Sequence, residues 1–225
     1  MSHSLVRPGA TRRQEPNVIA SAVGWIFAPV LAHRRALLWM NLLYFGALAV
    51  GVLYTLVDPS AQRALIDAVG VGYSQAGPLN TLADAYAHGQ VLSAIGLTFL
   101  VNLVVGSLGY LSVPSLVIPF GGLLVGIGRA VLWGVLFAPT AGIWGVELVP
   151  HIGTMIVEGE AYVVAMLGVW LWWWPVVTTP GARTSVWLAG LKLQARIYLA
   201  VATLLALAAV YEALEVIFLV IPLAS

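Results

Sequence analysis

The chain has 225 residues, of which 61% are hydrophobic and only 8% charged, and its mean hydropathy is +0.97. A soluble domain carries about 25% charged residues, so the composition excludes that class and favours an all-α bundle of membrane-spanning helices. The net charge of +1 and the scattered basic residues exclude a nucleic-acid-binding stripe, and the absence of cysteine excludes disulfides and thiolate metal sites.

The first 35 residues are predicted to form a cytoplasmic N-terminal arm. Residues 1–16 are polar and are not directly followed by a signal-peptide core with a cleavage site, so we expect the N-terminus to be retained. Residues 18–31 are apolar, contain Pro29 and end before His33. This segment is too short to cross a bilayer, which requires about 20 residues, and it indicates an interfacial or re-entrant helix.

Residues 36–225 are predicted to form the transmembrane domain. Apolar stretches of spanning length predict about five spans, at 36–57, 91–111, 115–137, 151–174 and 197–223. The less hydrophobic segment 58–90 predicts irregular structure or short surface helices. Ser112-Val113-Pro114 is the expected turn of a tight hairpin between the second and third spans.

The positive charges predict the orientation in the cell membrane. If the N-terminus is cytoplasmic, eight of the ten Lys and Arg residues fall on that side, at positions 7, 12, 13, 34, 35, 183, 192 and 196. Because Lys and Arg concentrate in cytoplasmic loops, this arrangement predicts a multi-pass protein of the cytoplasmic (inner) membrane with its C-terminus outside.

Two further patterns indicate how the spans pack and anchor. Small residues recur at every fourth position of the third span, at Gly122, Gly126, Ala130 and Gly134, and this spacing allows a neighbouring helix to approach closely. The fourth span ends in a tryptophan cluster that is typical of an interfacial anchor, formed by Trp170, Trp172, Trp173 and Trp174.

Ionisable residues recur inside the last three spans. Each charged side chain within a membrane costs at least about 2.5–3.5 kcal/mol on insertion scales, so we expect these residues to face one another or water in the outer half of the bundle. The predicted buried polar network consists of Arg129, His151, Glu158, Glu160, Glu212, Glu215 and, on the second span, Asn102. It can act as a structural ion-pair network, as a proton or ion relay or outward-facing polar cavity, or, with least support, in catalysis.

No pattern indicates a metal site, a catalytic residue or a specific cofactor. A zinc site normally requires three protein ligands, and the other histidines, His3, His33 and His88, lie away from His151. A lone histidine at a helix start is more often a cap or hydrogen-bond partner than a haem or chlorophyll ligand. Contacts with lipid or pigment on the aromatic faces are left open.

Three segments of the predicted spans carry short motifs: Pro150-His151 followed by Glu158 to Ala165, Asn102 in the second span, and Ala208 to Glu212 in the last. Together they resemble the stage II sporulation protein M family. The resemblance extends from Ala36 to the C-terminus. It implies a multi-span integral membrane protein without established enzymatic activity, whose sporulation members act as a membrane scaffold for a peptidoglycan-remodelling complex.

The leading hypothesis is therefore a non-enzymatic membrane scaffold or an accessory subunit of a membrane protein complex. Its expected partners are membrane lipids and other integral membrane proteins. One alternative is a transporter of ions, protons or small solutes that uses the buried Glu and Arg residues. Another is an accessory subunit of a photosynthetic or respiratory complex.

Overall fold

The computed structural model describes residues 18–140, 145, 148–179, 181 and 183–224. The regular structure of these residues is entirely helical, which confirms the predicted all-α class. The arm residues 1–17, including Arg7, Arg12 and Arg13, lie outside the described residues. The elements are α1 (Val18–Leu31), α2 (Arg34–Val57), α3 (Ser60–Ser74), α4 (Pro78–Ala87), α5 (Val91–Leu100), the π-helix η1 (Val101–Ser112), α6 (Val113–Val117), α7 (Gly121–Leu136), α8 (Leu148–Thr178), α9 (Arg183–Glu215), the π-helix η2 (Val216–Val220) and α10 (Ile221–Ala224).

Four of the described helical segments are long and apolar enough to cross a membrane, as expected for a multi-pass membrane protein. They are Arg34–Val57, Val91–Val117, Leu148–Thr178 and Thr184–Leu223. The expected third span, 115–137, contains α7, which has only 16 residues. At 1.5 Å per residue α7 is about 24 Å long, less than the ~30 Å hydrocarbon layer, so its length alone does not qualify it as a span.

The turn before α7 lies further along the chain than Ser112-Val113-Pro114, so that prediction was wrong. Helical structure continues through Pro114 to Val117, and the reversal occurs where Phe120 adopts a left-handed backbone conformation with φ of 58°. Pro114 stands in the first turn of α6, where its missing N–H costs little because the preceding segment is a π-helix and the hydrogen-bond register changes there. Proline therefore marks a change of helix type here, not a turn.

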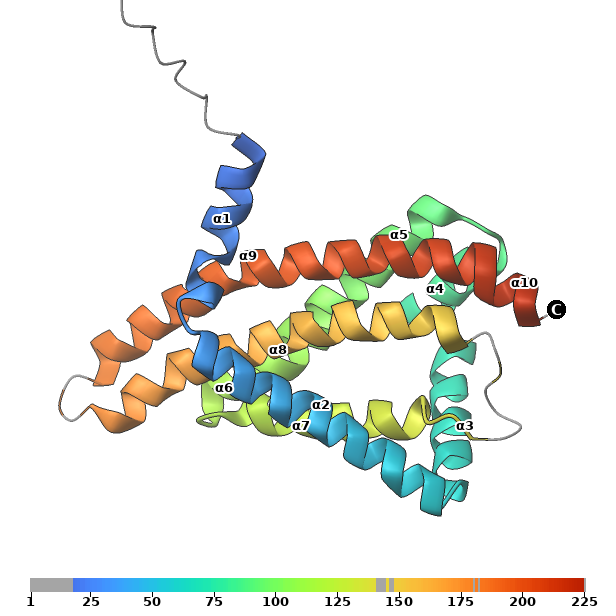
Figure 1. Cartoon of the computed structure of the whole chain (residues 1–225), viewed down its shortest axis with the longest axis horizontal. Coiled ribbons are helices and arrows are strands. Elements are labelled where there is room, and N and C mark those ends of the chain that lie inside the picture. Colours follow the sequence, from blue (N-terminus) through green and yellow to red (C-terminus); the bar gives the residue numbers. More distant parts are fainter. Residues whose placement is uncertain (1–17, 141–144, 146–147, 180, 182, 225) are drawn as a thin grey trace, which may run out of the picture.

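The long helices run along one axis of the molecule (Figure 1). α8 and α9 lie side by side in opposite directions, and α8 is the most enclosed of the candidate spans, with 67% of its apolar window buried. α1 projects away from this bundle across α9, whereas α3 lies across the opposite end. The fully buried Gln62 of α3 donates to the carbonyl oxygens of Leu136 (2.9 Å) and Ala138 (2.8 Å). These bonds satisfy carbonyl groups that the end of α7 leaves open.

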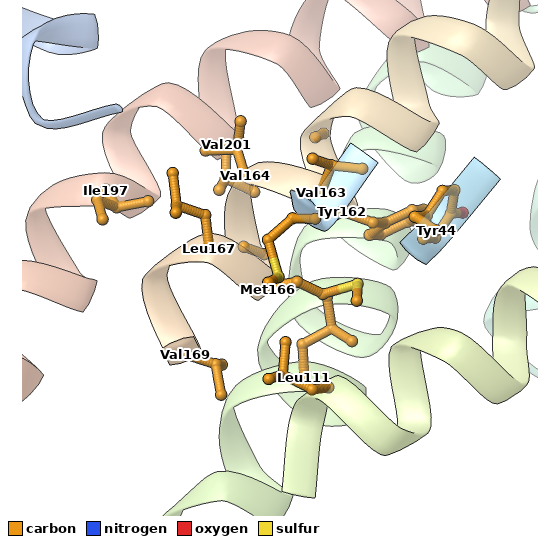
Figure 2. Packing of buried hydrophobic residues seen from close by; sticks show 14 of the residues in the cluster. Tyr44, Leu111, Tyr162, Val163, Val164, Met166, Leu167, Val169, Ile197 and Val201 are labelled. Atoms are coloured by element: carbon orange, nitrogen blue, oxygen red, sulfur yellow. The ribbon is translucent and has the colours of Figure 1, made fainter. Parts of the chain in front are cut away.

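The hydrophobic core surrounds α8 (Figure 2). Met166 and Leu167 of α8 are fully buried, as are Leu111 of η1 and Ile197 and Val201 of α9. Because lipid tails are as apolar as these side chains, close packing rather than exclusion from water holds such helices together. The interior of the bundle therefore depends on shape, and small residues decide where helices can touch.

The expected small-residue stripe of α7 contacts different neighbours along its length. Near Gly134, α2 passes so closely that a Cβ atom there would lie 2.0 Å from the carbonyl oxygen of Leu48. Gly51 of α2 is the counterpart, since its Cβ would lie 2.1 Å from the carbonyl oxygen of Val131. At the other end, a Cβ at Gly122 would meet the carbonyl of Leu111 at 1.7 Å. Two further stripe members are buried in between, Gly126 against Met166 and Ala130 with no exposed surface.

The tryptophan cluster is divided between the core and the surface. Trp172 has no exposed surface and Trp173 is 9% exposed, and the indole N–H of Trp173 donates to the carbonyl oxygen of Ser115 at 2.8 Å. Trp174 is 48% exposed and stacks on Trp170 with ring centroids 4.7 Å apart. The anchor prediction was therefore wrong for Trp172 and Trp173, because helical periodicity turns these two rings inward against α9 and α6.

Candidate functional site

The central helix α8 carries one polar face. His151, Thr154, Glu158 and Tyr162 follow one another at intervals of three and four residues, so they project from the same side of the helix. Thr154, Glu158 and Tyr162 are buried. This face meets α7 and η1 at one level and α9 at another, which gives two groups of polar contacts.

The first group centres on Arg129 of α7. Its Nη2 donates to the hydroxyl oxygen of Tyr162 at 2.9 Å, and that hydroxyl donates to Oε1 of Glu158 at 2.5 Å. Arg129 Nη2 and Glu158 Oε1 are 3.8 Å apart, so the tyrosine hydroxyl bridges an ion pair that makes no direct hydrogen bond. The guanidinium also lies over the ring of Tyr162, 4.2 Å from its centroid, where a cation is attracted to the π-system.

The π-helix η1 closes this group from a third side. Arg129 Nη1 donates to the carbonyl oxygen of Gly106 at 2.9 Å, and a Cβ atom at position 106 would lie 2.8 Å from the same nitrogen. A side chain at position 106 would therefore crowd the guanidinium where it meets this carbonyl. Asn102, one turn earlier in η1, is a hydrogen-bonding neighbour of Glu158. Arg129 thus ties η1, α7 and α8 together at one level.

The second group joins α8 to α9 nearer the first residue of α8. His151 Nδ1 and Glu215 Oε1 are 2.5 Å apart, and the hydroxyl of Thr154 donates to the same carboxylate oxygen at 3.2 Å. Glu215 is only 2% exposed, whereas 20% of the His151 side chain is exposed. Among the described residues, Oε2 of Glu215 is buried without a hydrogen-bond partner.

The remaining two carboxylates of the predicted network lie at its margins. Glu212, half-buried, interacts electrostatically with His151, Glu158 and Glu215 and has Tyr86 of α4 as a hydrogen-bonding neighbour. Glu160 is turned to another face of α8, where its neighbour is Asn41 of α2. The structure therefore brings Glu212 to the second group and leaves Glu160 outside both.

Arg129 lies near the middle of α7, as the ninth of its 16 residues and about 12 Å from Gly121. The two groups occupy different levels along α8, because His151 and Thr154 precede Glu158 and Tyr162 in that helix.

Sequence reasoning missed several groups that complete the site. The carbonyl of Gly106 gave no signal because it is a backbone atom. Tyr162 shares the spacing of Glu158 but is also an ordinary core residue. A separate polar network near α6 was missed as well. The buried Gln194 of α9 donates to the hydroxyl of Ser112 at 3.2 Å, and that hydroxyl is 2.7 Å from the hydroxyl of Tyr198. The sequence signal for this network was a glutamine four residues before a tyrosine in an apolar helix.

The arrangement can bind charge in the interior but offers few ligands for a metal. Within the part of the chain that the structure describes, no three His, Asp or Glu side chains come together as a potential metal site. The fold and these contacts define a polytopic helical membrane protein with buried charges. Comparison with models of protein families, with curated proteins and with solved structures gives no match.

Proposed function

We propose that this protein is a non-enzymatic integral membrane scaffold or accessory subunit, similar to the stage II sporulation protein M family. The observation that carries the proposal is the closed set of contacts around Arg129. Its guanidinium is engaged by Tyr162, Glu158 and the Gly106 carbonyl, all from the same chain. A charge bound in this way stabilises one arrangement of three helical segments and requires no substrate.

The outer faces of the bundle support a role in assembly. α2 exposes Leu38, Trp39, Leu42 and Leu53, each more than half exposed, and the π-helix η1 exposes Val104 at 52%. Such faces contact lipid tails or the helices of other membrane proteins. A rigid interior with apolar sides is what a membrane scaffold requires.

The distribution of charge supports one orientation of the scaffold in the membrane. The start of α2, which carries Arg34 and Arg35, and the first half of α9, which carries Lys192 and Arg196, lie towards the end where α8 turns into α9 (Figure 1). The helix α3, which carries Arg63, lies at the opposite end. The excess of basic residues supports placing the first end in the cytoplasm and the C-terminus outside the cytoplasmic membrane. In this arrangement α7 completes five crossings with the help of its flanking turns.

Isolation from native membranes in mild detergent tests the scaffold function. A chain tagged at its C-terminus is expected to co-purify with other integral membrane proteins at fixed stoichiometry. Gly46→Leu, on α2 where a Cβ meets no atom within 4 Å, is a matched surface variant that leaves the fold intact while changing an outer face. Recovery of the wild-type chain only as a lone monomer would contradict the proposal.

A second function, the transport of protons or small cations, is favoured by one observation. The two groups contain three carboxylates, Glu158, Glu212 and Glu215, but only Arg129 and His151 as bases, and Oε2 of Glu215 is buried without a partner in the described structure. A bound proton or cation would balance this excess, because like charges buried together disfavour ionisation.

Flux measurements in proteoliposomes separate the two functions. For a transporter, an imposed pH or sodium gradient drives flux that Glu212→Gln and Glu158→Gln reduce, whereas Glu160→Gln, outside both groups, retains it. For the scaffold, none of the four proteins conducts. Wild-type flux that survives both substitutions would exclude the relay.

A further inference from the structure

Charge is distributed very unevenly along the bundle. Neither residues 18–57 nor residues 161–211 contain an Asp or Glu. The end of the bundle where α1 meets α2 and α8 turns into α9 carries exposed basic side chains and, among the residues described, no acidic ones. We call this set the basic end, and it comprises Arg34, Arg35, Lys192 and Arg196.

The helix α1 lies at the basic end and across the axis of the bundle (Figure 1). It has 14 residues, which at 1.5 Å each make it about 21 Å long and too short to cross the hydrocarbon layer. Val30 packs into the core, but Ile19 is 76% exposed and Trp25 is 55% exposed. An apolar helix that crosses the spans at a steep angle is placed to lie in the plane of the membrane surface.

Arg196 is held in place by α1. Its guanidinium lies 4.4 Å from the ring centroid of Trp25, and its Nη2 donates to the Trp25 carbonyl oxygen at 3.5 Å. The side chain nevertheless remains exposed. A guanidinium has five N–H donors, so most remain available, and their planar fork matches the oxygens of a phosphate.

We propose that α1 and the basic end form a docking surface for anionic phospholipids of the surrounding leaflet. α1 lies among the upper acyl chains, Arg196 binds a lipid phosphate beside Trp25, and Arg34, Arg35 and Lys192 bind neighbouring headgroups. Charge complementarity selects this occupant, because the surface has four exposed cations and, in the part of the chain that the structure describes, no nearby carboxylate to compete for them. The inference rests on the proposed membrane placement but not on the scaffold role.

Lipid retention measures the interaction directly. The full-length protein is purified in a neutral detergent, mixed with phosphatidylglycerol, phosphatidylcholine or inorganic phosphate, and examined by native mass spectrometry and thermal unfolding. We expect phosphatidylglycerol to remain bound and to raise Tm by several degrees, and the other two to do neither. Equal retention of both lipids, or a response to inorganic phosphate alone, would overturn the proposal.

Variants locate the site. Arg196→Gln is expected to reduce phosphatidylglycerol retention at least threefold, and the combination with Lys192→Gln at least tenfold, whereas Arg63→Gln, an exposed base at the opposite end, has no effect. Arg196→Lys keeps the positive charge but loses the planar fork of donors. Its retention of phosphatidylglycerol is expected to lie between that of Arg196→Gln and that of the wild type. If a variant fails to fold, Trp25→Phe tests the same site, since it removes much of the cation–π contact and should weaken retention. Loss of retention in Arg63→Gln, or none in both Arg196→Gln and Trp25→Phe, refutes the site.

The outcome is independent of the scaffold experiment. A chain that is recovered alone from native membranes can still select anionic lipid, and a chain that co-purifies with partners can still lack this preference. Extraction of the protein from membranes by alkaline carbonate, without detergent, would instead contradict the membrane placement on which both proposals depend.

Discussion

Gly51 of α2 and Gly134 of α7 face each other where the two helices cross, and a Cβ placed on Gly51 would lie 3.0 Å from the Cα of Gly134. Neither residue has room for a side chain, since each added Cβ would also lie far inside van der Waals contact with a carbonyl oxygen of the other helix: 2.1 Å for Gly51 and 2.0 Å for Gly134. The crossing therefore depends on two glycines from different spans.

Alanine at either position should force the helices apart. We expect Gly51→Ala and Gly134→Ala each to lower the free energy of unfolding by about 2 kcal/mol, within the range found for overpacked cores. Gly46→Ala on α2 and Gly128→Ala on α7 are matched controls, because an added Cβ meets no atom within 4 Å at either site. The controls should be neutral or stabilising by up to about 1 kcal/mol in detergent unfolding measurements. Equal effects at all four positions would contradict the close approach of α2 and α7 at these two glycines.

Two neighbouring tyrosines should respond differently to loss of the hydroxyl. Both Tyr44 and Tyr162 are 1% exposed, but the Tyr162 hydroxyl bridges Arg129 and Glu158, whereas the Tyr44 hydroxyl has no partner among the described residues. Tyr162→Phe is expected to cost about 1.5–3 kcal/mol, the value for hydrogen bonds to charged groups, and Tyr44→Phe to be neutral or stabilising. Chemical unfolding of the two variants measures the difference, and the reverse order would contradict the bridge.

Two members of the tryptophan cluster, one buried and one half-exposed, should differ in how much they contribute to the free energy of unfolding. Trp172→Ala removes a fully buried ring that packs against Gly190 and should cost about 3–5 kcal/mol. Trp174→Ala removes a half-exposed ring whose main described contact is its stack on Trp170, and it should cost about 1 kcal/mol. Thermal unfolding in one detergent compares them. Similar losses would restore the interpretation that the whole cluster is an anchor.

Asp58 gives a pH-dependent effect at the end of α2. Its exposed carboxylate accepts hydrogen bonds from the backbone N–H (3.1 Å) and the hydroxyl (2.5 Å) of Ser60, and these bonds lower the pKa of Asp58 below its ordinary value. A lowered pKa means that the stabilisation is present above the ordinary pKa and is lost as the pH falls through the lowered value.

Hydrogen exchange can detect this effect locally. Amides in the first turn of α3 should exchange faster relative to the core as the pH is lowered below about 4, after correction for intrinsic rates. Asp58→Asn should show no such pH dependence. An identical pH profile in the wild type and this variant would contradict the role of the carboxylate.

The sequence predicted the helical class and about five apolar segments of spanning length, and four of these are confirmed as long apolar helices, because class and segments depend on composition and length. It placed the α6–α7 turn wrongly because proline was taken as a breaker, although a π-helix precedes Pro114. It named Arg129, Glu158, His151 and Glu215, since charge in an apolar segment is conspicuous. It could not pair them, because pairing depends on helix rotation and on groups such as the Gly106 carbonyl that carry no sequence signal.

The central claim is that Arg129 and Glu158 stabilise the bundle as a pair, and a double-mutant cycle of unfolding free energies tests it most directly. Arg129→Met and Glu158→Met should each cost about 3–5 kcal/mol, because each leaves its partner charged and buried. The double variant should cost much less than the sum, with a coupling energy of at least about 1.5 kcal/mol. Additive costs within about 0.5 kcal/mol would show that the two residues act independently and would contradict the account.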